Sequence, residues 1–268
     1  MFRTNHKLCQ GQITIYFPIL HRDMAPVNPL RSAVTPEIIR EKLGRILEID
    51  YSAFHREIYY MNQEKNIEKE PVYGSRAIMW QEITGRVRSS PGRLLLPVFT
   101  DDNLDDMLIR LVGNFRWELC RTMMGVAWND VTQPSLTSEY TDYIQFYRKN
   151  RDLSDDAKDK IKSQCSKYHG KMRDIFTSDY ELWINNESKG SARLNKVARS
   201  ILFKYCPFSR GIRGQLEKSP LFVDMVTMMK KHRSKLAREL ENHYRIYCKN
   251  NDTLDAVLEN NLRFYRDM

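Results

Sequence analysis

Four aspartates lie within the six residues from Asp101 to Asp106, the part of the sequence where catalytic chemistry is easiest to picture. Carboxylates four positions apart share one face of a helix, so Asp101 and Asp105 would point the same way. Such carboxylates bind hard cations such as Mg²⁺, which bridge to phosphate oxygens. The helix dipole also favours negative charge in a first turn. Two interpretations are open: a magnesium-dependent all-α enzyme that uses Asp101, Asp102 and Asp105, or an acidic helix start.

The spacing of these aspartates, D-D-x-x-D, is similar to the aspartate-rich motif of helical prenyl diphosphate synthases and terpene cyclases. In those families the motif holds magnesium and diphosphate, so the resemblance implies the same ligands at residues 101–106. The rest of that pattern is missing, because no second aspartate-rich motif follows and the arginine pair expected shortly after the first is absent.

A second short motif comprises His21, Arg22 and Asp23, with Asn28 five residues beyond the aspartate. The pattern H-R-D-x-x-x-x-N resembles the catalytic loop of protein kinases, which implies that Asp23 orients a substrate hydroxyl and Asn28 binds magnesium. The chain has no G-x-G-x-x-G loop, no D-F-G and no A-P-E element to accompany it. The prolines in this segment predict a turn into the first helix instead.

The remaining polar residues form no recognised catalytic motif. The histidines include no H-E-x-x-H pattern, and no G-x-S-x-G setting surrounds a serine or cysteine. The 5 cysteines show no C-x-x-C pair, which predicts reduced thiols rather than disulfides or a zinc site. We therefore expect a protein without metal or cofactor, a binder rather than an enzyme, in the cytoplasm where thiols stay reduced.

Apolar residues recur at helical spacing through most of the chain. Only Gln12 to Leu20 are expected to be extended. Helices are expected after Thr35, after Thr100 as the capping residue, from Ser154 to Trp183, and over the longest periodic run, Phe222 to Tyr247. In that last run Arg233 interrupts the apolar stripe. The sequence predicts an all-α fold, an irregular multi-helix bundle with a short extended N-terminal segment.

A break near residues 130–138, around Gln133-Pro134-Ser135, divides this pattern. It predicts two helical lobes, residues 1–132 and residues 133–268, with a single domain as the alternative. The longest uncharged stretch near the start, Leu8 to His21, is shorter than the roughly 20 apolar residues that span a bilayer. We therefore expect no integral membrane association.

Positive charge is concentrated in the C-terminal half. The chain has 43 Lys and Arg against 34 Asp and Glu, a net charge of +9, and residues 151–268 carry +8 of it. Residues 189–249 alone carry +11, which would attract an anionic partner. Phosphate contacts from such a surface supply affinity without reading sequence. The candidate contact residues are Lys189, Arg193, Lys196, Arg199, Lys204, Arg210, Arg213, Lys230, Lys231, Arg233, Lys235 and Arg238.

The sequence thus favours a non-catalytic helical binding or assembly protein whose basic C-terminal third docks on an anionic partner. Nucleic acid is the first candidate and an acidic protein the second; the oligomeric state is left open. Tyr205, Phe208, Tyr244 and Tyr247 are candidates for stacking on bases, although aromatics at helical spacing are more often core. The main alternative is a structural subunit of a larger assembly, and solvated helix faces would also explain the charge.

Overall fold

The computed structural model describes residues 7–9, 13–19, 32–33, 36–50, 78–80, 93–97, 99–100, 103–250, 262–263 and 266. The multi-helix fold predicted from the sequence is confirmed, because eight α-helices account for most of this described part. They are α1 Pro36–Ile49, α2 Leu104–Met124, α3 Leu136–Phe146, α4 Asp155–Lys167, α5 Met172–Asn185, α6 Lys196–Tyr205, α7 Arg210–Leu216 and α8 Val223–Asn250. Short 3₁₀ turns follow three of them: η1 Gly125–Ala127, η2 Tyr147–Lys149 and η3 Glu187–Lys189.

Short strands occupy the N-terminal part: β1 Lys7–Cys9, β2 Ile13–Ile19, β3 Ser32–Ala33, β4 Ile78–Trp80, β5 Arg93–Pro97 and β6 Phe99–Thr100. Four of them form a sheet in the order β1-β2-β5-β4, in which β2 and β5 run parallel, and β3 pairs with β6. The sequence predicted only β2, as the extended segment. Runs as short as the other five carry no periodicity that separates them from loops.

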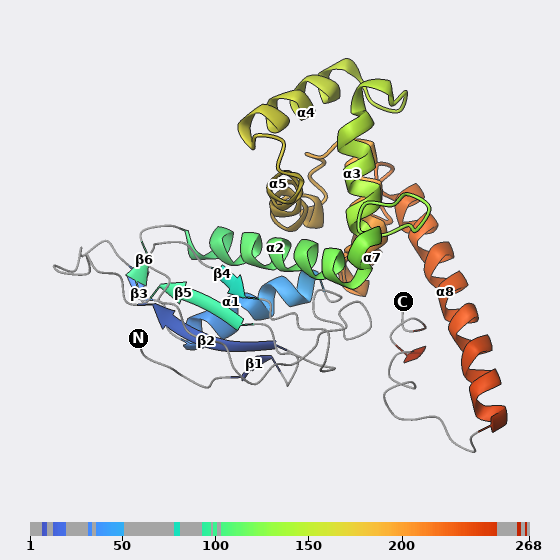
Figure 1. Cartoon of the computed structure of the whole chain (residues 1–268), viewed down its shortest axis with the longest axis horizontal. Coiled ribbons are helices and arrows are strands. Elements are labelled where there is room, and N and C mark those ends of the chain that lie inside the picture. The colour runs from blue at the N-terminus through green and yellow to red at the C-terminus, as the bar shows by residue number, and fades with distance from the viewer. Residues whose placement is uncertain are drawn as a thin grey trace.

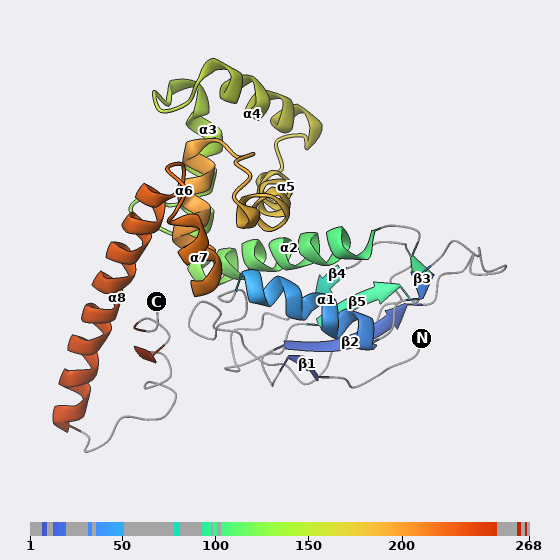
Figure 2. The ribbon, with the colours of Figure 1, turned by 180° about the vertical axis from the view of Figure 1, so that it is seen from behind.

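Helix α2 lies between two layers of the molecule. Figures 1 and 2 show the strands and α1 on one side of α2, and α3, α4 and α5 on the other, with α8 along an outer edge. The core is continuous across these layers, from Leu43 in α1 to Met229 in α8. The boundary expected near residue 132 stays a prediction.

Polar side chains cap α3, α4 and α6, and the sequence predicted the start at Ser154. Ser135 and Ser138 form a capping box at α3, Ser154 accepts from the amide of Ala157 at α4, and Asn195 caps α6. The cap predicted at Thr100 is wrong. Thr100 lies in β6, and Asn103 Oδ1 accepts from the amide of Asp105 at 2.9 Å, because α2 begins at Leu104.

The single helix predicted from Ser154 to Trp183 is two helices. His169 and Gly170 both adopt positive φ, 51° and 69°, between α4 and α5. Glycine tolerates this left-handed conformation and ends helices for that reason. The break lets α4 fold back over α5, where Ile161 joins the core.

Aromatic side chains and a close helix contact build the centre of the core. Gly113 in α2 faces Tyr180 in α5, and a Cβ at Gly113 would lie 3.0 Å from Tyr180 Cδ1. Further along, Trp183 stacks on Phe208 with ring centroids 3.9 Å apart. These contacts place α5 at the middle of the helical layer.

A buried ion pair joins the layers on the two sides of α2. Asp50, directly after α1, receives hydrogen bonds from the Arg116 guanidinium in α2 and the Tyr180 hydroxyl in α5. Arg116 also donates to the carbonyl oxygen of Tyr205 at the end of α6. Because buried charges are tolerated only when paired and hydrogen-bonded, this network fixes the four helices relative to one another.

Candidate functional site: the basic face of α8

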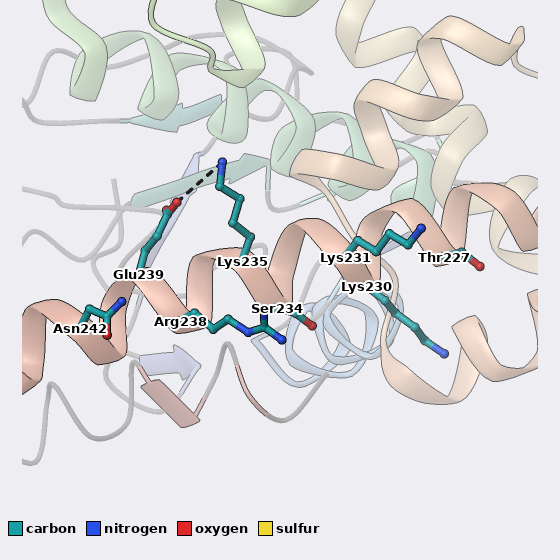
Figure 3. Close-up of a pocket in the computed structure, with 8 residues that line it drawn as sticks. All are labelled: Thr227, Lys230, Lys231, Ser234, Lys235, Arg238, Glu239 and Asn242. Carbon is teal, nitrogen blue, oxygen red and sulfur yellow. Dashed lines mark ion pairs between the residues drawn. The ribbon is translucent and has the colours of Figure 1, made fainter.

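Helix α8 has a buried face and an exposed basic face. The residues of the buried face follow one another at spacings of one, three and four positions, so they lie on one side of the helix. They are Met225, Val226, Met229, Arg233 and Ala237. The opposite side lines an open pocket of about 480 Å³. We call this side the α8 basic face, and its residues are Thr227, Lys230, Lys231, Ser234, Lys235, Arg238, Glu239 and Asn242 (Figure 3).

The four cations of this face are only weakly neutralised. Lys230 forms a partly exposed ion pair with Glu217 after α7, and Lys235 Nζ lies 3.8 Å from Glu239 Oε1 in a largely exposed pair. Such exposed pairs contribute little and exchange readily for another anion. Lys231 and Arg238 make no ion pair with any residue that the structure describes. The face therefore presents positive charge to solvent.

The positive charge around α8 also acts on the pKa of His232. This residue lies at the edge of the buried face of α8, and burial lowers its pKa first. The neighbouring charges of Lys204, Arg233 and Lys235 lower the pKa further, while Glu139 opposes them. A cationic imidazolium is disfavoured where positive charge already accumulates.

Arg199 does not belong to the binding surface that the sequence predicted. Its Nε donates to Glu187 Oε2 at 2.6 Å, and its side chain is 8% exposed. Glu187 also accepts from the amides of Arg193 and Leu194, so the pair anchors the connection into α6. The guanidinium lies 5.2 Å from the ring centroid of Phe222 as well. The Arg199 guanidinium therefore stabilises the fold from inside the protein instead of lying on its surface.

Arg213 and Arg233 were also predicted as contact residues, and both are buried. Arg213 lies in α7 with Nη1 4.0 Å from Met229 Sδ in α8, so it packs between these helices. Arg233 lies on the buried face of α8 among its apolar residues. The sequence contained a signal for Arg233, because it interrupts the apolar stripe at a position where a core side chain was expected.

The other predicted contact residues are divided among several surfaces. Lys204 is half-buried and paired with Glu139 of α3, so its charge is already neutralised. Lys189, Arg193, Lys196 and Arg210 are exposed, but they lie in η3, the following loop, the start of α6 and the start of α7. None of them lines the α8 pocket. The structure thus brings together only Lys230, Lys231, Lys235 and Arg238.

The aromatic residues considered for base stacking are mostly used elsewhere. Phe208 is fully buried against Trp183, and the Tyr205 hydroxyl donates to Glu139 Oε1 at 2.7 Å. Tyr244 is half-buried, and the side chain of Tyr247 lies outside the described residues. No aromatic residue lines the α8 pocket in the described part of the chain.

One family comparison bears on this half of the chain. A family described as "Domain of unknown function (DUF8509)" matches residues 125–265, more than half of the chain. The chain belongs to the DUF8509 family. The matched part contains α3 to α8 and therefore the whole α8 basic face. No curated protein and no solved structure matches the chain.

The DUF8509 part also contains a buried carboxyl group that sequence reasoning missed. Asp179 in α5 accepts from the Tyr140 hydroxyl of α3 at 2.6 Å and from Gln164 Nε2 of α4 at 2.8 Å. Burial raises the pKa of Asp179 to about 6, although both hydrogen bonds oppose the shift. Nothing local in the sequence marks this site, because its three residues come from three different helices.

Of the aspartate cluster at residues 101–106, the structure describes Asp105 and Asp106, and both contact side chains of other helices in this chain. Lys42 Nζ lies 2.6 Å from Asp105 Oδ1, and Asn185 Nδ2 donates to Asp106 at 3.1 Å. Asp101 and Asp102 lie outside the described residues, as does the kinase-like segment of His21 to Asn28. Among the residues that are described, no group of three or more His, Cys, Asp and Glu is placed to hold a metal ion.

None of the described helices combines the length and apolar character needed to cross a membrane.

Proposed function

We propose that this DUF8509 protein is a non-catalytic binding module that docks the α8 basic face on nucleic acid. The observation that carries the proposal is the convergence of four cations on one exposed face of a helix whose other face is anchored in the core. Phosphate groups are the anions that a polynucleotide presents at regular spacing. A location in the cytoplasm, where buried thiols such as Cys206 stay reduced, is part of the same proposal.

Two physical arguments support the α8 basic face over the wider basic region. The cations project from a rigid helix, so binding orders their side chains but not the backbone that carries them. Their neutralising partners, Glu217 and Glu239, are partly and largely exposed, so another anion can replace them, whereas Glu187 holds Arg199 inside the protein. The polar residues Thr227, Ser234 and Asn242 add hydroxyl and amide groups, which commonly bind phosphate and sugar.

The test is binding of the full chain to fluorescent single- and double-stranded DNA and RNA at several salt concentrations. The variant Lys231→Glu with Arg238→Glu reverses two exposed cations of the face. We expect it to abolish measurable binding, and we expect wild-type affinity to fall steeply with salt. Arg233 is left unchanged, because reversing a buried charge would test folding rather than binding.

A matched control is available on α4. Lys160 and Lys162 are exposed and lie away from α8, and Lys160→Glu with Lys162→Glu makes the same change in net charge. We expect this control to bind almost as well as the wild type. The proposal is overturned if the wild type binds no nucleic acid at low salt. The assignment to α8 is overturned if both variants lose affinity equally, since net charge alone would then explain binding.

A further inference from the structure

We infer that the α8 basic face recognises double-stranded B-form DNA by lying in its major groove. This inference rests on the proposed function and narrows it to one class of nucleic acid. Three features of the face point to this partner: its length and regularity, the kinds of side chain it carries, and a pocket that no aromatic residue lines within the described part of the chain.

The dimensions of the face match the groove. The pocket residues extend from Thr227 to Asn242 on one side of a continuous helix, a length of about 22 Å at 1.5 Å per residue. A helix with side chains is about 10 to 12 Å wide, and the major groove of B-form DNA is about 12 Å wide. Figures 1 and 2 show α8 at an outer edge of the molecule, which would let a long duplex approach it.

The side chains are divided between the flanks and the centre of the face. In Figure 3, Lys235 and Glu239 point to one side of α8, and Lys230 points to the other. Lysines on both flanks suit the two phosphate backbones that border a groove. Around the helix axis, at about 100° per residue, Arg238 and Asn242 fall between Lys230 and Lys235, although both lie farther along the helix. These are the residue types that bind guanine and adenine through two hydrogen bonds.

Other nucleic acids fit these features less well. Proteins that bind single strands stack bases on aromatic side chains, and within the described residues none lines this face. The major groove of A-form RNA is deep and narrow, so a helix such as α8 cannot enter it. Duplex DNA is therefore the partner that the face selects.

The experiment compares the full chain on four probes of one sequence: duplex DNA, duplex RNA and the two single strands. Each probe has about 20 nucleotides per strand, roughly three times the length that α8 would cover at 3.4 Å per base pair. We expect duplex DNA to bind at least about tenfold more tightly than the other three, because only its major groove admits the helix. A major-groove dye, methyl green, should compete with the protein, whereas the minor-groove ligand netropsin should not.

Two further measurements locate the contact. Dimethyl sulfate methylates guanine N7 in the major groove, so we expect bound protein to protect guanines in the duplex. Arg238→Lys should keep most of the affinity, because the positive charge stays, but should reduce this protection, because lysine lacks the planar fork of arginine. The Lys160→Glu, Lys162→Glu variant serves as the control and should protect guanines like the wild type.

The possible failures are distinguishable. Equal or tighter binding to single strands or duplex RNA, or competition by netropsin alone, overturns the major-groove inference and leaves nucleic-acid binding standing. Binding to duplex DNA without guanine protection overturns it as well. Failure to bind all four probes at low salt overturns both this inference and the proposed function.

Discussion

Glu187 and Arg199 form an ion pair inside the protein, with Nε 2.6 Å from Oε2 and side-chain exposures of 0% and 8%. Glu187 also accepts hydrogen bonds from the amides of Arg193 and Leu194. The pair thus fixes the chain between η3 and α6, and its guanidinium reaches the Phe222 ring just before α8. This buried pair therefore contacts the start of the helix that carries the proposed site, whose own buried face anchors it in the core.

Replacing Arg199 with Met tests the structural role of this pair. The change leaves the Glu187 carboxylate buried without its cation, and we expect the free energy of unfolding to fall by about 3 to 5 kcal/mol. Urea denaturation followed by circular dichroism measures it. Lys196→Met, an exposed change in the same helix, should stay within about 0.5 kcal/mol of the wild type. Equal stability of both variants would show that the pair contributes little.

Arg233 and Arg238 lie on different faces of α8, so reversing their charge should affect the stability of the fold differently. Arg233→Glu places a carboxylate on the buried face, and we expect a loss of about 3 to 5 kcal/mol in the free energy of unfolding. Arg238→Glu changes an exposed residue and should alter stability by less than about 0.5 kcal/mol. Thermal and urea unfolding of the two variants side by side provide the measurement. A stable Arg233→Glu protein would mean that this side of α8 is exposed.

The contact between α2 and α5 makes Gly113 sensitive to the smallest substitution. Alanine usually improves a helix over glycine by up to about 1 kcal/mol. At Gly113, however, the added Cβ would lie 3.0 Å from Tyr180 Cδ1, and Tyr180 is held by its hydrogen bond to Asp50. We expect Gly113→Ala to lower the free energy of unfolding by about 1 to 3 kcal/mol, as in other overpacked cores.

The matched control for this substitution is Gly44→Ala in α1. Apart from the backbone of α1 itself, no atom of the described residues lies within 4 Å of a Cβ at Gly44, so only the helix preference of alanine should act. We expect its free energy of unfolding, measured by urea denaturation, to rise by up to about 1 kcal/mol. If both alanine variants are stabilised, Tyr180 yields to the added methyl group and the contact is not tight.

Asp179 should make stability depend on pH. Burial raises its pKa to about 6 in the folded protein, whereas the unfolded chain keeps the usual value of 3.8. Between pH 3.8 and about 6, Asp179 is protonated in the folded protein but ionised in the unfolded chain. The stabilisation from this group is therefore fully present below pH 3.8 and is lost as pH rises through about 6. Asp179 thus lowers the free energy of unfolding by at most about 1 kcal/mol for each pH unit of this rise.

Asp179→Asn removes this titration. We expect the stability of the variant relative to wild type to improve as pH rises from about 4 to 6, and then to stay constant. Tyr140→Phe removes a hydrogen bond that lowers the pKa of Asp179, so it should move the wild-type transition to higher pH. Urea denaturation at a series of pH values measures both. A difference between Asp179→Asn and wild type that does not vary with pH would contradict the raised pKa.

Some features of the fold were predictable because they depend on neighbouring residues. The starts at Ser135 and Ser154 follow from side chains that accept from amides within the next turn. The periodic apolar residues of α2 and α8 likewise identify helices without any knowledge of their partners. The break at Gly170 was also visible in principle, since glycine favours the positive φ that the chain adopts there.

The candidate site was predictable only in part. Residue types and their spacing were enough to predict that positive charge gathers in the C-terminal half, that the chain is mainly helical, and that α8 has an apolar stripe. Which cations reach solvent depends on how the helices pack. Arg199 is removed from the surface by Glu187, twelve residues earlier, and Arg213 by the packing of α7 on α8. The number of charges in a sequence does not indicate which of them are buried, because desolvation and pairing depend on contacts between helices rather than on spacing along one of them.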